Sequence, residues 1–417
     1  MTKTKLGKHL LFTSILAALI LIAPIKCYAV IGVSDIVTLT LKNNRNIKRA
    51  EELLKKATFD FKSQVASVMP YVSLSTRVSK TNGVSLYHNI GITLTQPIDV
   101  SGKISDALKL ANLQVKMAKA NLLEVKRKTV FKAKSIFYRI LLDKSLIKVE
   151  EMHIHSLKER YKTISEKYKK GMVSYHDLIR AKVDLSNAYP HYISLKNTLK
   201  SDTNGLCLLV GKSIRKETLP KSLPYKHYNL PPESLIEKQA LKNRPDLLLA
   251  KLNEDLARLS LLLKKKENSP QLTFLANFVL HSSLSKENHN FTLSLNLNIP
   301  IYDSNKNKFD IKSQVAYLKS ISLAKLQLIE EIKKEVKDAY NSVKKAESTI
   351  RAIKGTIQQA KLGLKIATTR YKEGLSTYLD LMNSELALHT ARVNMSEAIY
   401  SYLTSIANLK LVEGETH

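Results

Sequence analysis

The feature that most constrains this chain of 417 residues is a sequence phrase that occurs twice. The first copy spans Tyr168–Leu178 and the second spans Tyr371–Leu381, and both follow the pattern Tyr-x-x-Gly-x-x-Ser/Thr-x-x-Asp-Leu. Matched positions lie 203 residues apart throughout the phrase. A repeat of this size indicates two copies of one structural unit, so the architecture has to be understood from that unit.

The two halves also agree upstream of the phrase. A helical stretch opens at Asn44 in the first half and at Arg244 in the second, and Pro70 and Pro270 each precede a segment of alternating apolar residues. In each half we therefore predict a helix, a β-hairpin, a long helix and, after a glycine, a further helix. The predicted regions are a signal peptide (1–29), the first repeat (30–220, hairpin about 70–97), a proline-rich connector (221–232), the second repeat (233–410, hairpin about 270–300) and a C-terminal tail (411–417).

The first 29 residues have the composition of a secretory signal peptide. Three lysines precede an apolar run from Leu10 to Ala23, and Ala29 ends a pattern of small residues suited to cleavage. The run has 14 residues, fewer than the roughly 20 that a transmembrane helix needs. We expect cleavage near Ala29, which leaves Val30 as the first residue. Acylation of Cys27 is the alternative, although the residues before it depart from a lipobox.

Composition narrows the class of protein further. Without the signal, Cys207 is the only cysteine, so no disulfide can form within the chain. The net charge is +31, and it is +27 once the four lysines of the signal are removed. These charges are spread along predicted helices, with no arginine-rich arm. We interpret them as a solvated basic surface that favours anionic lipid headgroups, and we expect no nucleic acid as a partner.

Four segments alternate apolar and polar residues with a period of two. The clearest runs from Phe291 to Ile299, where Leu295 belongs to the apolar face and Asn296 to the polar face. Each segment has about ten residues, the length of a tilted transmembrane strand. Four strands are too few to close a barrel, whereas three chains would supply about 12, with no open edge. Turns are expected at Asn82–Gly83 and at Ser285–Asn290.

The long helix of the second half, expected from about Asn305 to Arg370, carries a sustained heptad. Apolar or small residues recur in alternating steps of four and three at Val336, Ala339, Val343, Ala346, Ile350, Ile353, Ile357, Ala360, Leu364 and Ala367. This pattern is typical of the seam of a coiled coil. At 1.5 Å per residue the helix is roughly 100 Å long, which exceeds what a compact domain requires.

The signal peptide, duplicated halves, paired hairpins and repeated phrase together resemble the TolC family of outer-membrane efflux and secretion ducts. The resemblance covers essentially the whole mature chain and implies a mainly α protomer with a transmembrane β portion. It implies a homotrimer, in which a 12-strand β-barrel in outer-membrane lipid joins a long periplasmic α-helical barrel. It also implies a periplasmic adaptor (membrane fusion) protein and an inner-membrane transporter of the RND or ABC type as partners, and no cofactor.

The repeated phrase supplies the candidate functional residues. Gly171 and Gly374 follow the long helices, where a left-handed residue commonly ends a helix. Capping boxes for the next helices are predicted at Ser174 with Asp177 and at Thr377 with Asp380. The resemblance adds that these helical tips form the periplasmic aperture of the duct.

The same resemblance exposes a departure in charge at the tips. Family members carry a second acidic residue three positions after the one matched by Asp380, and this chain has Asn383 there. In the first half, Asp177 is followed three residues later by Arg180, which we expect to approach and pair with a carboxylate. Since rings of charge set the selectivity of a pore, we expect weaker cation preference than in acidic relatives. A role for Asp380 in capping alone is the alternative.

The sequence contains no motif of enzymatic chemistry. It has no glycine-rich phosphate loop, no His-Glu-x-x-His, no Gly-x-Ser-x-Gly and no cysteine pair. His153 and His155 are the nearest approach to a metal pair, but a spacing of two places them on different helix faces. We therefore expect no enzyme and no metal site. Tyr71, Tyr87 and Tyr302 fit an interfacial aromatic girdle or ordinary packing equally well.

Two other classes of protein fit parts of the sequence. A periplasmic coiled-coil scaffold without a pore would share the long helices, and an exported protein that binds nucleic acid or lipopolysaccharide would share the basic charge. The paired hairpins instead favour a channel in the outer membrane that extends into the periplasm. The sequence therefore predicts the passive exit duct of a tripartite efflux pump or a type I secretion system.

Overall fold

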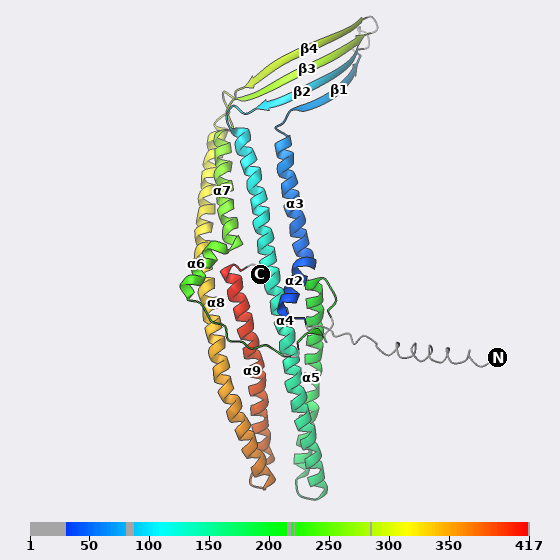
Figure 1. Ribbon diagram of the computed structural model, residues 1–417, viewed down its shortest axis with the longest axis vertical. Coiled ribbons are helices and arrows are strands. Elements are labelled where there is room, and N and C mark those ends of the chain that lie inside the picture. The colour runs from blue at the N-terminus through cyan, green and yellow to red at the C-terminus, as the bar shows by residue number, and fades with distance from the viewer. Residues whose placement is uncertain (1–30, 81–86, 215–217, 221, 284–285, 416–417) are drawn as a thin grey trace, which may run out of the picture.

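The protein is an elongated rod of long helices that carries a four-stranded sheet at one end (Figure 1). The computed structural model describes residues 31–80, 87–214, 218–220, 222–283 and 286–415. The predicted signal peptide, its cleavage site and the predicted turn at Asn82–Gly83 lie outside the described residues. Within the described residues, no helix combines the length and apolar character needed to span a membrane.

The duplication predicted from the sequence extends to the lengths of the elements. The first repeat contains α2 (Val33–Asn43), α3 (Arg45–Ala66), β1 (Tyr71–Ser79), β2 (Tyr87–Ile98), α4 (Lys103–Lys169) and α5 (Tyr175–Val210). The second contains α6 (Glu233–Asn243), α7 (Pro245–Lys265), β3 (Gln271–Ser283), β4 (Lys286–Asn298), α8 (Lys306–Lys372) and α9 (Tyr378–Glu413). The long helices α4 and α8 both have 67 residues, and α5 and α9 both have 36.

The short helices α2 and α6 are separate elements that the sequence pattern did not distinguish. In the first repeat, the Asn44 backbone is extended, and its side chain accepts a 2.9 Å hydrogen bond from the Asn46 amide to cap α3. In the second repeat, Pro245 at the first position of α7 has no amide hydrogen to donate to α6. Each break lets the chain turn from a short helix into a longer one. The described part of the predicted connector, 222–232, holds no helix or strand.

The predicted heptad is confirmed as the packing seam of α8. Its positions from Val336 to Ile350 are at most 5% exposed, and they join α6, α7 and α9 in one apolar core. The helix runs from Lys306 to Lys372, close to the expected bounds. A second core, centred on Phe137 and Leu141, joins α2, α4 and α5 in the first repeat. In the half of the rod away from the sheet, α4 with α5 and α8 with α9 therefore form two helical hairpins, whereas α3 and α7 pack against α4 and α8 in the half nearer the sheet (Figure 1).

The last helix is longer than predicted. It continues to Glu413, three residues past the expected boundary at 410, because Leu409 and Val412 pack into the core with α6 and α8. Gly414 then adopts φ 91°, a left-handed conformation that ends the helix.

The four predicted strands form one antiparallel sheet in the order β1-β2-β3-β4. Pairing of β2 with β3 joins the two repeats, and Ile92 lies opposite Phe278 in that ladder. The predicted turn at Ser285–Asn290 is wrong for 286–290, because β4 begins at Lys286, which pairs with Ser283, and Ser285 lies outside the described residues. Polar side chains suggested a turn there, but backbone pairing satisfies the amide and carbonyl groups of this stretch and extends the strand.

Candidate functional site: the helical tips, the equatorial network and the apolar sheet face

Both tip glycines adopt the left-handed conformation expected of them. Gly171 has φ 73° and Gly374 has φ 77°, each immediately after the residue that closes its long helix. The amides after the glycines complete the ends, with Met172 donating to the Lys167 carbonyl at 2.9 Å and Leu375 to that of Arg370 at 2.8 Å. Because nothing lies within 4 Å of a Cβ built on either glycine, backbone conformation alone accounts for the residue type.

The two predicted capping boxes are confirmed. The Ser174 hydroxyl accepts from the Asp177 amide at 3.1 Å, and the Thr377 hydroxyl accepts from the Asp380 amide at 3.2 Å. The carboxylates return bonds to the capping residues, which completes both boxes. The Asp380 carboxylate accepts from the Thr377 hydroxyl, the Thr377 amide and the Ser376 hydroxyl. These bonds, led by the Thr377 hydroxyl, lower the pKa of Asp380 below its usual value, so the group is ionised at neutral pH.

The other two candidate residues lie in the second turns of the tip helices. Arg180 on α5 is half-buried and Asn383 on α9 is exposed. In the described protomer Arg180 forms no ion pair, so its predicted pairing with a carboxylate is not made within one chain. An aperture role for the eight tip residues remains a prediction about the assembled protein.

The two tips are packed against each other inside one protomer. Ile164, Ala181 and Tyr378 form a small apolar cluster that joins α4, α5 and α9. The Tyr378 hydroxyl donates to the Asp184 carboxylate at 3.4 Å, and burial together with that carboxylate raises the pKa of Tyr378 to about 12. In addition, the Lys167 ammonium lies 4.7 Å from the centre of the Tyr371 ring.

A buried ion pair strengthens this contact between the hairpins. Arg160 of α4 pairs with Glu385 of α9, and the Ser156 hydroxyl donates to the same carboxylate. Glu385 is 6% exposed, so removal of Arg160 would leave a buried charge without its partner. None of the three residues lies in the repeated phrase, and sequence reasoning did not find them.

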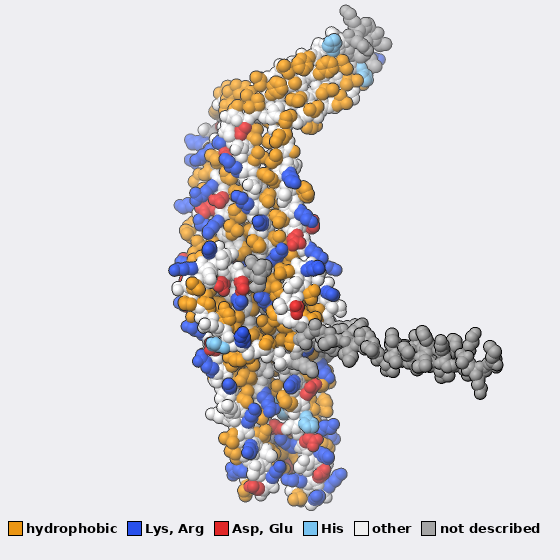
Figure 2. Space-filling view, viewed as in Figure 1, with side chains coloured by type: hydrophobic (Ala, Val, Ile, Leu, Met, Phe, Trp, Pro, Cys, Tyr) orange, Lys and Arg blue, Asp and Glu red, His pale blue; other side chains and the backbone are white. Residues whose placement is uncertain are grey.

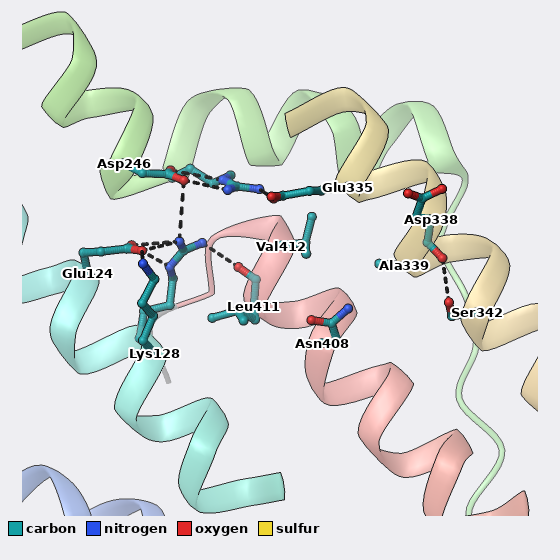
Figure 3. Close-up of a pocket in the computed structure, with 12 residues that line it drawn as sticks. Glu124, Lys128, Asp246, Glu335, Asp338, Ala339, Ser342, Asn408, Leu411 and Val412 are labelled. Carbon is teal, nitrogen blue, oxygen red and sulfur yellow. Dashed lines mark hydrogen bonds and ion pairs between the residues drawn. The ribbon is translucent and has the colours of Figure 1, made fainter. Parts of the chain in front are cut away.

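Halfway along the rod, a network of charged side chains lines a cavity of about 460 Å³ between α4, α7, α8 and α9 (Figure 3). Arg127 on α4 donates to both oxygens of Glu124, at 2.9 and 3.0 Å. Arg244 donates to both oxygens of Asp246, at 3.1 and 2.6 Å, and to Glu335 at 2.6 Å. Both arginines are at most 6% exposed, and Arg127 lies 3.9 Å from the Asp246 carboxylate, so a buried ion pair at this level connects the two repeats.

The sheet presents one continuous apolar face. Cross-strand pairing aligns Leu74 with Ile92, Ile92 with Phe278, and Phe278 with Phe291. Apolar side chains cover the sheet in Figure 2, and Leu293, Leu295 and Leu297 are each about 60% exposed. Among the described residues, β1 and β4 each pair on one side only. An exposed apolar face with two open edges is typical of a surface that lipid or a further copy covers.

The described residues contain no group of histidine, cysteine and carboxylate side chains that could hold a metal ion. His155 is exposed, whereas His153 is half-buried and stacks on His389 from the other repeat. The two histidines therefore do lie on different faces of α4. The contact with His389 depends on how the repeats dock, and no local pattern in the sequence signals it.

This fold, with its duplicated helical hairpins and its sheet of amphipathic strands, defines a class of outer-membrane channel protomer. The family model described as outer membrane efflux protein matches residues 36–212 and 236–415, one match for each repeat. The chain belongs to that family, which confirms the resemblance to TolC-type proteins and the predicted class of fold.

Individual relatives are distant. Outer membrane protein TolC of Vibrio cholerae is 21% identical over 260 residues, which cover 60% of this chain and 59% of that protein. Nodulation protein T of Rhizobium leguminosarum bv. trifolii is 23% identical over 280 residues, which cover 64% and 58% of the two chains. The matches thus span less than two thirds of these curated relatives. The solved Campylobacter jejuni CmeC outer membrane channel shares the fold with a TM-score of 0.81, at 19% identity, covering 92% of this chain and 85% of that chain.

Proposed function

We propose that this protein is the passive exit duct of a tripartite efflux pump or a type I secretion system in the outer membrane. The observation that carries the proposal is the exposed apolar face of the sheet, which one protomer leaves uncovered and open at β1 and β4. Exposure of such an apolar face to water is unfavourable, whereas contact with lipid is not. A neighbouring strand would form the missing backbone hydrogen bonds at each edge.

An assembly of three protomers would both pair the open strand edges and let lipid cover the apolar face. If β4 of one copy pairs with β1 of the next, about twelve strands close into a barrel, within the range of outer-membrane proteins. The apolar face of each sheet would then contact lipid around the whole circumference. The helical hairpins would form a tube below the barrel, with the tips of Gly171 and Gly374 at its far end.

The family supports partners of two kinds. A periplasmic adaptor would dock on the helical tube, and an inner-membrane transporter of the RND or ABC type would choose the exported substrate. A duct of this kind does not select its cargo by chemistry. The signal peptide would be removed near Ala29, and the intact mass of the mature chain, starting at Val30 without lipid, would establish this.

A matched pair of substitutions tests the proposal. Leu295→Asp places a charge on the apolar face, and Asn296→Asp places the same charge on the opposite face of the same strand. We expect the first to impair assembly, by no more than about 2–4 kcal/mol per protomer, and the second to be mild. The readout is the mass of the detergent-extracted particle, for which we expect a trimer in the parent protein. A monomeric parent, or equal effects of the two changes, would contradict the proposal.

A further inference from the structure

Three histidines meet where α9 of the second repeat packs against α4 and α5 of the first. His153 of α4 stacks on His389 of α9, with ring centres 4.2 Å apart and planes inclined by 27°. His191 of α5 lines the same cavity, which has a volume of about 310 Å³. The cluster therefore bridges the two helical hairpins, close to the buried pair of Arg160 and Glu385.

The surroundings of the stack hold it in the neutral state. The His389 side chain is 16% exposed, and its Nδ1 atom is buried without a hydrogen-bond partner in the described structure. Its Nε2 atom lies 3.5 Å from the Glu150 carboxylate. The charged and titratable groups that face the stack are Glu150 and Arg160 from α4, Asp184 and His191 from α5, and Glu385 and Arg392 from α9.

Burial dominates the proton affinity of both rings. It lowers the pKa of His389 to about 4, and the neighbouring His153, His191 and Arg392 act in the same direction while Glu385 opposes them. Burial and the Arg160 charge also lower the pKa of His153. The Glu150 carboxylate would favour protonation of His389, but burial raises the pKa of Glu150, so this counter-charge weakens as the pH falls.

We propose that the stacked His153 and His389 rings form a proton-sensitive latch between the two helical hairpins, closed while both rings are neutral and released when they are protonated. Like charges at a separation of 4.2 Å repel, and each desolvated cation gains by moving into water. The effect on α9 is a property of the protomer. Its consequence, a duct whose tip region loosens in acid, rests on the proposed function.

The sign and size of the effect follow from proton linkage. A released histidine has an ordinary pKa of about 6.5, so the open state binds more protons than the latched state below that pH. The latch is therefore fully stable above about pH 6.5 and weakens as the pH falls toward 4. Between pH 7.5 and 5.0, protonation of His389 alone shifts the latch equilibrium roughly tenfold or more toward the open state.

Amide hydrogen exchange of the intact assembled protein tests the latch. After correction for the intrinsic effect of pH on exchange, opening of the α9 segment 378–395 should rise at least tenfold from pH 7.5 to 5.0. His389→Gln and His153→Gln should each reduce this rise, and the double variant should abolish it. His155→Gln, which alters an exposed histidine two residues away on α4, is the matched control and should leave it unchanged.

A further variant acts on the proton affinity without removing a ring. Arg392→Gln deletes a positive charge that faces His389 and so raises the pKa of the latched ring toward that of a released histidine, which should make the rise in α9 opening between pH 7.5 and 5.0 smaller. The latch would be overturned if opening of α9 in the parent protein did not depend on pH. It would also be overturned if the His153→Gln/His389→Gln protein kept the full pH dependence. The readout does not depend on conduction, so the latch and the proposed duct can fail separately.

Discussion

The Arg127 guanidinium of the first repeat donates a 2.7 Å hydrogen bond to the backbone carbonyl of Leu411 near the end of the second repeat. Near the end of α5, by contrast, the Leu209 carbonyl accepts a 2.6 Å bond from Asn44 within its own repeat. The two copies of the unit thus complete their last helices differently. The last helix of the second repeat depends on a hydrogen bond from the first repeat, so Arg127 connects the two duplicated halves.

Replacement of Arg127 should therefore be costly. Arg127→Met leaves the Glu124 carboxylate buried without the guanidinium that pairs with it, and we expect a loss of about 3–5 kcal/mol of stability. Lys128→Met is the matched control, because Lys128 pairs with the same carboxylate at 3.0 Å but is 70% exposed, and it should cost less than about 1 kcal/mol. Thermal unfolding of the detergent-solubilised protein measures the loss of stability in both variants. Similar losses would contradict the structural role assigned to Arg127.

Two left-handed glycines should differ in their tolerance of a side chain. Gly374→Ala introduces only backbone strain of about 1–2 kcal/mol, because nothing lies within 4 Å of the added Cβ. Gly414→Ala carries the same strain and also places its Cβ 3.0 Å from the Asn243 backbone, so we expect a clearly larger loss of about 2–4 kcal/mol. The thermal unfolding midpoints of the two variants measure this difference in stability. A larger loss at Gly374 would show that the tip is packed by other chains.

One buried carboxyl should make stability depend on pH. Burial, aided by the nearby Asp202 carboxylate, raises the pKa of Asp143 to about 7. The unfolded chain then binds fewer protons than the folded chain between about pH 4 and 7, so this residue costs increasing stability as the pH rises through that window. Asp143→Asn should stabilise the protein by about 2 kcal/mol at pH 8 and far less at pH 4. Asp255→Asn, at an exposed site on α7, should show no such trend in the same melts.

Charge at the tips should tune the selectivity of the duct. Three copies of Asp380 would supply about three carboxylates at the aperture, where an acidic residue in place of Asn383 would make about six. We expect weak cation preference in the parent protein, weaker preference in Asp380→Asn and stronger preference in Asn383→Asp. Reversal potentials in a salt gradient provide the measurement. If neither substitution moves the potential, only the capping role seen in the structure remains for Asp380.

Features encoded within one segment could be predicted from the sequence. The heptad of α8, the alternation in β4, the left-handed Gly171 and Gly374 and the capping boxes all depend on residues a few positions apart. The misplaced turn at Ser285–Asn290 has the same local origin, since polar side chains are compatible with either a turn or a paired strand. Backbone pairing with β3, which the local sequence does not indicate, makes this stretch a strand.

Contacts between the repeats could not be predicted. Arg160 with Glu385, His153 with His389, and Arg127 with Leu411 join positions more than two hundred residues apart. Each contact depends on how two long helices dock, and a single charged or aromatic residue on a helix carries no sign of its distant partner. These contacts nonetheless hold the two hairpins together. The way in which the two repeats dock therefore depends on contacts that the repeated sequence pattern does not encode.

Single-channel recording in a planar lipid bilayer tests the central claim most directly. The purified, assembled protein should produce discrete and reproducible conductance steps, and the same preparation of Leu295→Asp should produce few or none because its barrel assembles poorly. Asn296→Asp should conduct like the parent. Bilayers that stay silent with an intact, assembled parent protein would contradict the account and favour a periplasmic scaffold without a pore.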